Sequence, residues 1–176
     1  MLRYHDIKKD DQLNGDGLRA TLFLSGCSHC CPECHNPQTW DRRSGIPFKE
    51  ADKEELFNEL SNDYISGITF SGGDPLFTLN VVDVHNLCVE IKNKFPNKTI
   101  WLYTGYEYET IMEDYYEGTI SEVRKAIVTN FVDVLVDGTY KKDLRDSQLK
   151  WRGSSNQRVI DVKKSLSENK IVLWCD

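Results

Sequence analysis

Strand-like apolar runs alternate with amphipathic helical patterns along most of this 176-residue chain. Such alternation predicts an α/β fold, with a parallel sheet, closed or partly closed, and helices packed outside it. The length suits one domain, and we expect residues 1–176 to form it. The expected strands are Leu18–Ser25, Ile65–Phe70, Thr99–Thr104, Phe131–Val136, Arg158–Val162 and Ile171–Trp174; the expected helices are Lys49–Tyr64, a helix N-capped by Asn80 that is broken at Pro96, and a helical stretch over Tyr108–Thr129.

Four of the six cysteines fall within eight residues, directly after the first expected strand. In α/β folds this edge of the sheet is where ligands bind. Read as Cys27/Cys30 and Cys31/Cys34, the run contains two C-x-x-C pairs, which is typical of zinc. Read as Cys27, Cys31 and Cys34, it is a three-thiolate set that could hold three metals of a four-metal cluster and leave one open for a ligand.

The adjacency of Cys30 and Cys31 helps to choose between these interpretations. Neighbouring residues in an extended loop tend to point apart, so four thiolates are hard to place around one ion. The spacing therefore favours an iron–sulfur cluster, with a zinc site and unliganded or redox thiols as the alternatives. His29 and His35 could complete a zinc site, although a loop histidine is more often a surface residue or one that supports the ligands without binding the metal.

A glycine-rich segment, Ser71-Gly72-Gly73-Asp74-Pro75, follows the second expected strand. Its two glycines permit positive φ and close approach of the backbone, so its backbone groups could bind a small charged ligand. The alternative is a tight turn. No Gly-Lys-Ser/Thr follows, so the segment is not a phosphate loop.

Composition excludes several classes of partner. The net charge is −6 without a long basic run, which argues against nucleic acid. No apolar stretch approaches the ~18–20 residues of a membrane span, and the N-terminus lacks a signal-peptide core. We therefore expect a cytoplasmic protein with no membrane partner, whose cysteines are thiols or metal ligands rather than disulfides.

Several segments, taken in order, resemble the radical S-adenosylmethionine (SAM) enzymes, and among them the activating proteins of anaerobic ribonucleoside-triphosphate reductases. The three-cysteine motif defines the superfamily, and the resemblance spans nearly the whole chain. The matching segments are Asn14–Gly17, Leu24–Asn36, Thr39-Trp40, Ser71–Leu76, Ile100–Tyr106, Asp133–Gly138 and Trp151–Gln157.

The resemblance implies an oxidoreductase with the compact partial (β/α) barrel of the radical SAM type. Cys27, Cys31 and Cys34 would ligate three irons of one 4Fe-4S cluster, and SAM would chelate the fourth. One electron, from a donor such as a flavodoxin, would cleave SAM reductively. The resulting radical would take a hydrogen atom from a glycine of the large subunit of the reductase, leaving a glycyl radical.

The same resemblance assigns the SAM contacts to two segments. Gly72-Gly73-Asp74 would hold the methionine amino group, and the backbone of Glu33-Cys34-His35 would lie along the adenine. Three features depart from the commonest family pattern: Cys30 is an extra cysteine, Glu33 replaces an aromatic residue, and Asp74 replaces a glutamate. The alternative functions are activation of another glycyl-radical enzyme, such as pyruvate formate-lyase, and a non-catalytic zinc-binding module.

Overall fold

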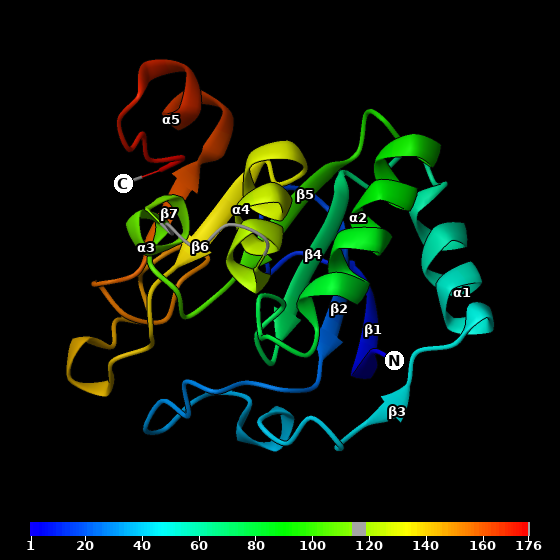
Figure 1. Cartoon of the computed structure of the whole chain (residues 1–176), viewed down its shortest axis with the longest axis horizontal. Helices are drawn as coiled ribbons and strands as arrows, with labels where there is room; N and C mark the ends of the chain where they lie inside the picture. The colour runs from blue at the N-terminus through cyan, green and yellow to red at the C-terminus, as the bar shows by residue number, and fades with distance from the viewer. Residues whose placement is uncertain (114–118, 176) are drawn as a thin grey trace.

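The computed structural model describes residues 1–113 and 119–175. Within these residues the chain forms a mixed α/β fold around one seven-stranded sheet of order β3-β1-β2-β4-β5-β6-β7 (Figure 1). The strands are β1 (Arg3–Asp11), β2 (Arg19–Leu24), β3 (Ile46–Pro47), β4 (Gly67–Gly72), β5 (Thr99–Tyr103), β6 (Val134–Asp137) and β7 (Arg158–Asp161); the α-helices are α1 (Glu50–Leu60), α2 (Val81–Lys94), α3 (Tyr108–Met112), α4 (Ile120–Asn130) and α5 (Val162–Glu168); two 3-10 turns are η1 (Pro37–Thr39) and η2 (Lys142–Leu144).

The centre of the sheet is parallel and its edges are antiparallel. Strands β2, β4, β5 and β6 pair in parallel, as the alternation predicts. Strand β1 pairs antiparallel with β2, and β7 pairs antiparallel with β6. A parallel neighbour needs a long crossover, usually a helix. The β6–β7 connection (residues 138–157) contains only the short turn η2 among its regular elements, and β7 returns beside β6 in the opposite direction.

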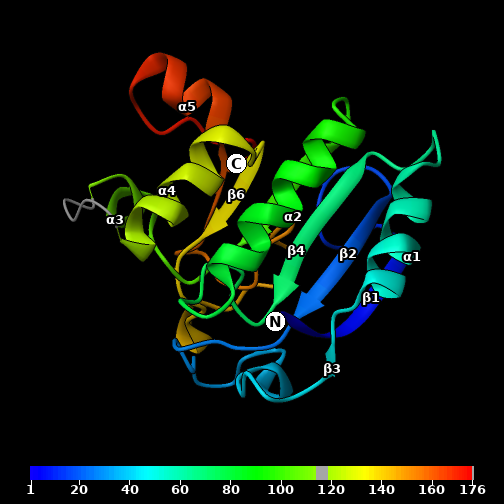
Figure 2. The same ribbon diagram turned by 45° about the vertical axis from the view of Figure 1, so that its right-hand side comes forward.

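Alternation of side chains along the strands separates the two faces of the sheet. One face carries apolar side chains such as Leu22, Phe70 and Leu102, which are fully buried. Helices α1, α2 and α4 lie over this face in both orientations of the molecule (Figures 1 and 2). Helix α2 adds its buried stripe of Val84, Leu87, Cys88 and Ile91 to this core.

Most expected elements are confirmed, with differences at the ends of the chain. Strand β1 was not expected. Of the predicted strand Ile171–Trp174, the structure retains an isolated bridge between Leu173 and Ile160. The predicted helical stretch Tyr108–Thr129 contains α3 and α4, and its residues 114–118 lie outside the described part of the chain. Among the described residues, no helix combines the length and the apolar character needed to cross a membrane.

Asn80 precedes α2, as predicted, but its side chain does not cap the helix. Its amide nitrogen instead donates to the carbonyl oxygens of Ser25, at 2.8 Å, and Asp74, at 3.2 Å. The reason is spatial: the loops that follow β2 and β4 meet here, and their carbonyl groups are buried. Asn80 therefore joins the two segments that the sequence marks as candidate site residues.

Candidate functional site

The cysteine loop (residues 26–36) leaves the carboxyl end of β2 and is fixed at its start by backbone hydrogen bonds. Gly26 has φ +101°, a conformation that favours glycine. The Gly26 amide donates to the Thr39 carbonyl at 2.7 Å, and the Cys27 amide donates to the Trp40 carbonyl at 3.1 Å. The turn η1 thereby turns the chain back along the loop and holds the first cysteine at the edge of the sheet.

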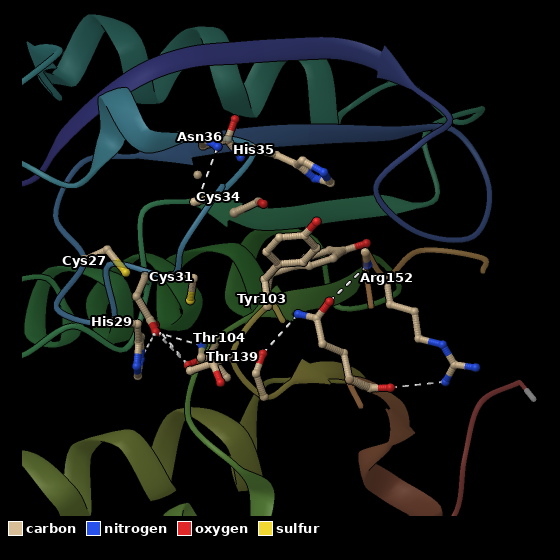
Figure 3. Close-up of a pocket in the computed structure, with 18 of the residues that line it drawn as sticks. Cys27, His29, Cys31, Cys34, His35, Asn36, Tyr103, Thr104, Thr139 and Arg152 are labelled. Atoms are coloured by element: carbon tan, nitrogen blue, oxygen red, sulfur yellow. Dashed lines mark hydrogen bonds and ion pairs between the residues drawn. The ribbon is translucent and has the colours of Figure 1, made fainter. Parts of the chain in front are cut away.

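Cys27, Cys31 and Cys34 line one pocket of about 360 Å³. Figure 3 shows Cys27 and Cys31 on one side of this pocket and Arg152 on the other. Cys30 is exposed and does not line the pocket. The structure therefore brings together the three cysteines of the C-x3-C-x2-C set and leaves the extra cysteine outside.

The other walls of the pocket come from the carboxyl ends of the neighbouring parallel strands and from the β6–β7 connection. His35 and Gly72-Gly73-Asp74, all expected in the site, line it. Glu33 is the exception among the expected residues, because its carboxylate forms an ion pair with Lys142 of the β6–β7 connection. The remaining walls include Tyr103, Thr104, Gly105, Gly138, Tyr140, Trp151 and Gly153.

The glycine segment allows two loops to pack closely. The Gly73 amide donates to the Leu24 carbonyl and the Asp74 amide to the Gly26 carbonyl, each at 2.8 Å. A Cβ atom on Gly73 would lie 2.5 Å from the Gly26 oxygen, which is too close for any side chain. Gly72 has φ +93°. Gly73 is thus required for contact with the cysteine loop, and Gly72 for contact with the backbone of Leu24 at the end of β2. Both roles go beyond the tight turn that was the alternative interpretation.

The Asp74 carboxylate is buried and already surrounded by donors. The Thr104 hydroxyl lies 3.0 Å from both oxygens, and the amides of Leu76 and Gly105 donate to it at 2.8 and 3.0 Å. His29 Nε2 lies 2.8 Å from Oδ2. The donors on Leu76, Thr104 and Gly105 occupy three of the about four lone-pair sites that a carboxylate offers.

Burial controls the protonation of two of the pocket thiols. It raises the pKa of Cys27 to about 11, because desolvation disfavours the thiolate. It also raises the pKa of Cys31. Both groups are therefore neutral thiols at pH 7 in the metal-free protein. A metal that binds them has to displace their protons, as is usual for thiolate ligands.

Within residues 1–113 and 119–175, no group of three or more His, Cys, Asp or Glu side chains is arranged to hold a single metal ion. A four-iron cluster makes a different demand, because its thiolates bind separate irons. The residues present fit that demand: three thiols from one short loop line one pocket.

Sequence reasoning missed Tyr140 and Lys142, because no local pattern shows that residues so distant in the chain meet the cysteine loop.

Comparison with known proteins identifies the family of the chain. Residues 13–160 match the family model of the 4Fe-4S single cluster domain. The chain is 41% identical over 164 residues to the anaerobic ribonucleoside-triphosphate reductase-activating protein of Escherichia coli K12, covering 92% of this chain and 100% of the relative. The chain belongs to this family. The family resemblance drawn from the motifs is thereby confirmed.

Other reductase-activating proteins match over a similar length. The protein of that name from Enterobacteria phage T4 is 40% identical over 158 residues, covering 90% of this chain and 93% of the relative. That of Vibrio cholerae is 37% identical over 160 residues, covering 90% of this chain and 97% of the relative. The match to the 4Fe-4S domain supports an iron–sulfur cluster as the cofactor of this activating-protein family member.

Proposed function

We propose that this chain is a radical SAM activase, which reductively cleaves SAM at a 4Fe-4S cluster and generates a glycyl radical on the large subunit of an anaerobic ribonucleoside-triphosphate reductase. The observation that carries the proposal is the convergence of Cys27, Cys31 and Cys34 on a pocket that Gly72 and Gly73 also line. The names of the relatives support the choice of partner.

The three cysteines would hold the cluster through three of its irons. The bound cluster with SAM would supply the one-electron chemistry that cleaves SAM. The protein would contribute position and exclusion of water. Because three protein donors already bind the Asp74 carboxylate, we assign the contact with the methionine amino group to the backbone of Gly72-Gly73-Asp74. The backbone of Glu33-Cys34-His35 would lie along the adenine.

The proposal extends to the architecture and the surroundings of the protein. The parallel strands β2, β4, β5 and β6, whose carboxyl ends surround the pocket, would form the partial barrel of a single radical SAM domain. The electron would come from a donor such as a flavodoxin, in the cytoplasm. A protein glycine is a bulky substrate, so the reductase is expected to cover the pocket during the reaction.

Anaerobic reconstitution with iron and sulfide tests the cofactor. We expect a brown protein that absorbs near ~400 nm through charge transfer from the thiolates, with about four irons per chain. Cys27→Ser, Cys31→Ser and Cys34→Ser should each abolish SAM cleavage. Cys30→Ser is the matched control and should have a mild effect, because that thiol lies outside the pocket. A colourless protein holding one zinc, damaged as much by Cys30→Ser as by Cys27→Ser, would favour the zinc module instead.

Electron paramagnetic resonance then tests the partner. The reconstituted, reduced protein is mixed with SAM and either the anaerobic reductase or pyruvate formate-lyase. A glycyl radical signal with the reductase alone supports the proposal. The same signal with pyruvate formate-lyase alone assigns the chain to that other class of activase.

A further inference from the structure

We infer that His29 is a positioning residue, which fixes the cysteine loop to the glycine segment through the Asp74 carboxylate and thereby sets the cluster ligands in register with the SAM site. The inference rests on the proposed function for its link to SAM. It gives a specific contact and role to a side chain for which the sequence left a zinc ligand, a surface residue and a residue that supports the ligands as alternatives.

The cysteine loop needs such a contact because its backbone is unusual. Cys30 has φ +45° and Glu33 has φ +55°, which lie in the left-handed region that side chains other than glycine seldom adopt. Ser28, Cys30, Pro32 and Glu33 are all exposed. Conformations of this kind persist only where surrounding structure enforces them. Contacts from the loop to the strand ends are therefore required to hold its shape.

His29 makes that contact between Cys27 and Cys31. Its Nε2 atom is shielded from solvent and lies 2.8 Å from Asp74 Oδ2, at ion-pair distance, although its direction departs from that of a good hydrogen bond. His29 and Thr104, which lie close together in Figure 3, both contact this carboxylate. Because Nε2 faces this carboxylate, we assign the imidazole the role of a tether between the loop and Asp74.

The imidazole ring packs against residues that follow β5. The ring packs edge-on against Tyr106, with centroids 4.7 Å apart. Tyr106 is itself held by Arg124, whose Nη2 donates to the phenol oxygen at 2.9 Å. A Cβ atom on Gly105 would lie 2.4 Å from His29 Cδ2, so a side chain at that position would displace the ring. The site is thus shaped to accept His29.

Asp74 consequently joins three loops. It belongs to the segment after β4, it accepts from Thr104 and Gly105 after β5, and it contacts His29 after β2. Loss of the imidazole leaves all three cysteines in the chain, and the Gly26–Asp74 hydrogen bond still holds the start of their loop. It removes the contact that fixes the part of the loop between Cys27 and Cys31 to Asp74. The cluster can still assemble, while its fit to SAM deteriorates.

The test compares His29→Ala, His29→Gln and Gly105→Ala with Ser28→Ala, an exposed neighbour in the same loop. After reconstitution we measure iron per chain, the change that SAM causes in the spectrum of the reduced cluster, and KM and kcat for SAM cleavage. For His29→Ala and Gly105→Ala we expect wild-type iron content, a diminished spectral change and a KM raised about tenfold, more than kcat falls. His29→Gln keeps a donor near the Nε2 position and should stay within about threefold of wild type.

A second measurement needs no cofactor. In the metal-free protein, hydrogen exchange of the Gly105 amide, which donates to Asp74, should accelerate in His29→Ala and remain unchanged in Ser28→Ala. Unchanged exchange of the Gly105 amide in His29→Ala overturns the inference. This test does not depend on the cluster: if the wild type assembles no cluster, the proposed function fails, but the exchange experiment still tests the role of His29. Unchanged KM and spectrum in His29→Ala also overturn the inference. The inference is also overturned if His29→Ala loses as much iron as Cys31→Ala does. It is overturned as well if His29→Gln does not recover the wild-type KM and spectral change.

Discussion

The guanidinium of Arg19 lies over the indole of Trp101, 5.3 Å from the ring centroid, on the face of the sheet opposite α1, α2 and α4. It is fully buried and has five donors to satisfy. It donates to the carbonyl oxygens of Ile68 and Thr99 at 2.7 and 3.0 Å, and to the hydroxyls of Thr69 and Thr99 at 2.8 and 3.0 Å. One side chain thus joins β2, β4 and β5 at the end of the sheet away from the pocket.

Arg19→Met should lower the free energy of unfolding by about 3 kcal/mol or more, because it leaves several buried acceptors unpaired. Arg19→Lys should recover only part of the loss, since one ammonium cannot reach the same set of acceptors. Urea unfolding measures both changes. Arg43→Met is the control: its side chain is 90% exposed, and the change should stay within about 0.5 kcal/mol. Equal effects at the two arginines would contradict this account.

Asp133 should make the free energy of unfolding depend on pH in the acidic range. Burial by itself would raise the pKa of this carboxyl, but hydrogen bonds from Lys163, the Ile100 amide and Lys92 outweigh it and hold the pKa below its ordinary value. A lowered pKa in the folded state stabilises the fold above the unfolded value of about 3.9, and this contribution is lost as pH falls through the folded value. Asp133→Asn should therefore destabilise the protein at pH 7, and the difference from wild type should shrink below about pH 4.

Denaturant unfolding of both proteins at pH 7, 5 and 3 measures that difference. Asp63→Asn provides a matched control, because the Asp63 side chain is exposed in the turn after α1. The Asp133 interpretation fails if the difference between wild type and Asp133→Asn is the same at pH 7 and pH 3.

The sequence predicts the central strands well. They are covered on both faces of the sheet, so most of their residues are buried and their sequences are continuous apolar runs. The sequence misses β1, whose run Arg3–Asp11 is mostly charged and lies near the sheet edge with only part of its residues buried. The direction of β7 is also not visible locally, since it depends on the path of the β6–β7 connection. Edge strands and strand direction depend on tertiary contacts that periodicity does not report.

The candidate site divides in the same way. Cysteine spacing and the Gly72-Gly73 pair are local signals, and they correctly indicate residues that share a pocket. The state of Asp74 is not a local property: its carboxylate is occupied by Thr104 and Gly105, some thirty residues later in the chain. Sequence can therefore identify residues that share this site, while the fold decides which groups of the glycine segment remain available.

Thiol reactivity in the metal-free protein should separate the cysteines by burial. The thiolate is the form that reacts with alkylating agents. Because burial raises the pKa of Cys27 to about 11, its rate of alkylation by iodoacetamide should be slow at pH 7 and should keep rising with pH toward that value. Cys88 is fully buried, with its pKa raised to about 12, and should react only after unfolding. Peptide mapping by mass spectrometry gives both rates, and early labelling of Cys88 would contradict its place in the core.

The ion pair between Glu33 and Lys142 joins the cysteine loop to the β6–β7 connection across 109 residues of sequence. Both side chains are 57% exposed, so the pair should contribute less than about 1 kcal/mol to global stability. Its effect should be local. Lys142→Ala should accelerate hydrogen exchange of the β6–β7 connection at low salt while leaving the urea midpoint nearly unchanged.

A charge swap isolates the electrostatic part of that effect. Glu33→Lys and Lys142→Glu should each accelerate exchange of residues 139–157, because each places like charges together, and the double variant should restore the wild-type rate. At 1 M salt the Debye length falls to about 3 Å, so wild type and variants should converge. Rates that differ equally at low and high salt would show that packing, rather than charge, holds the two loops together.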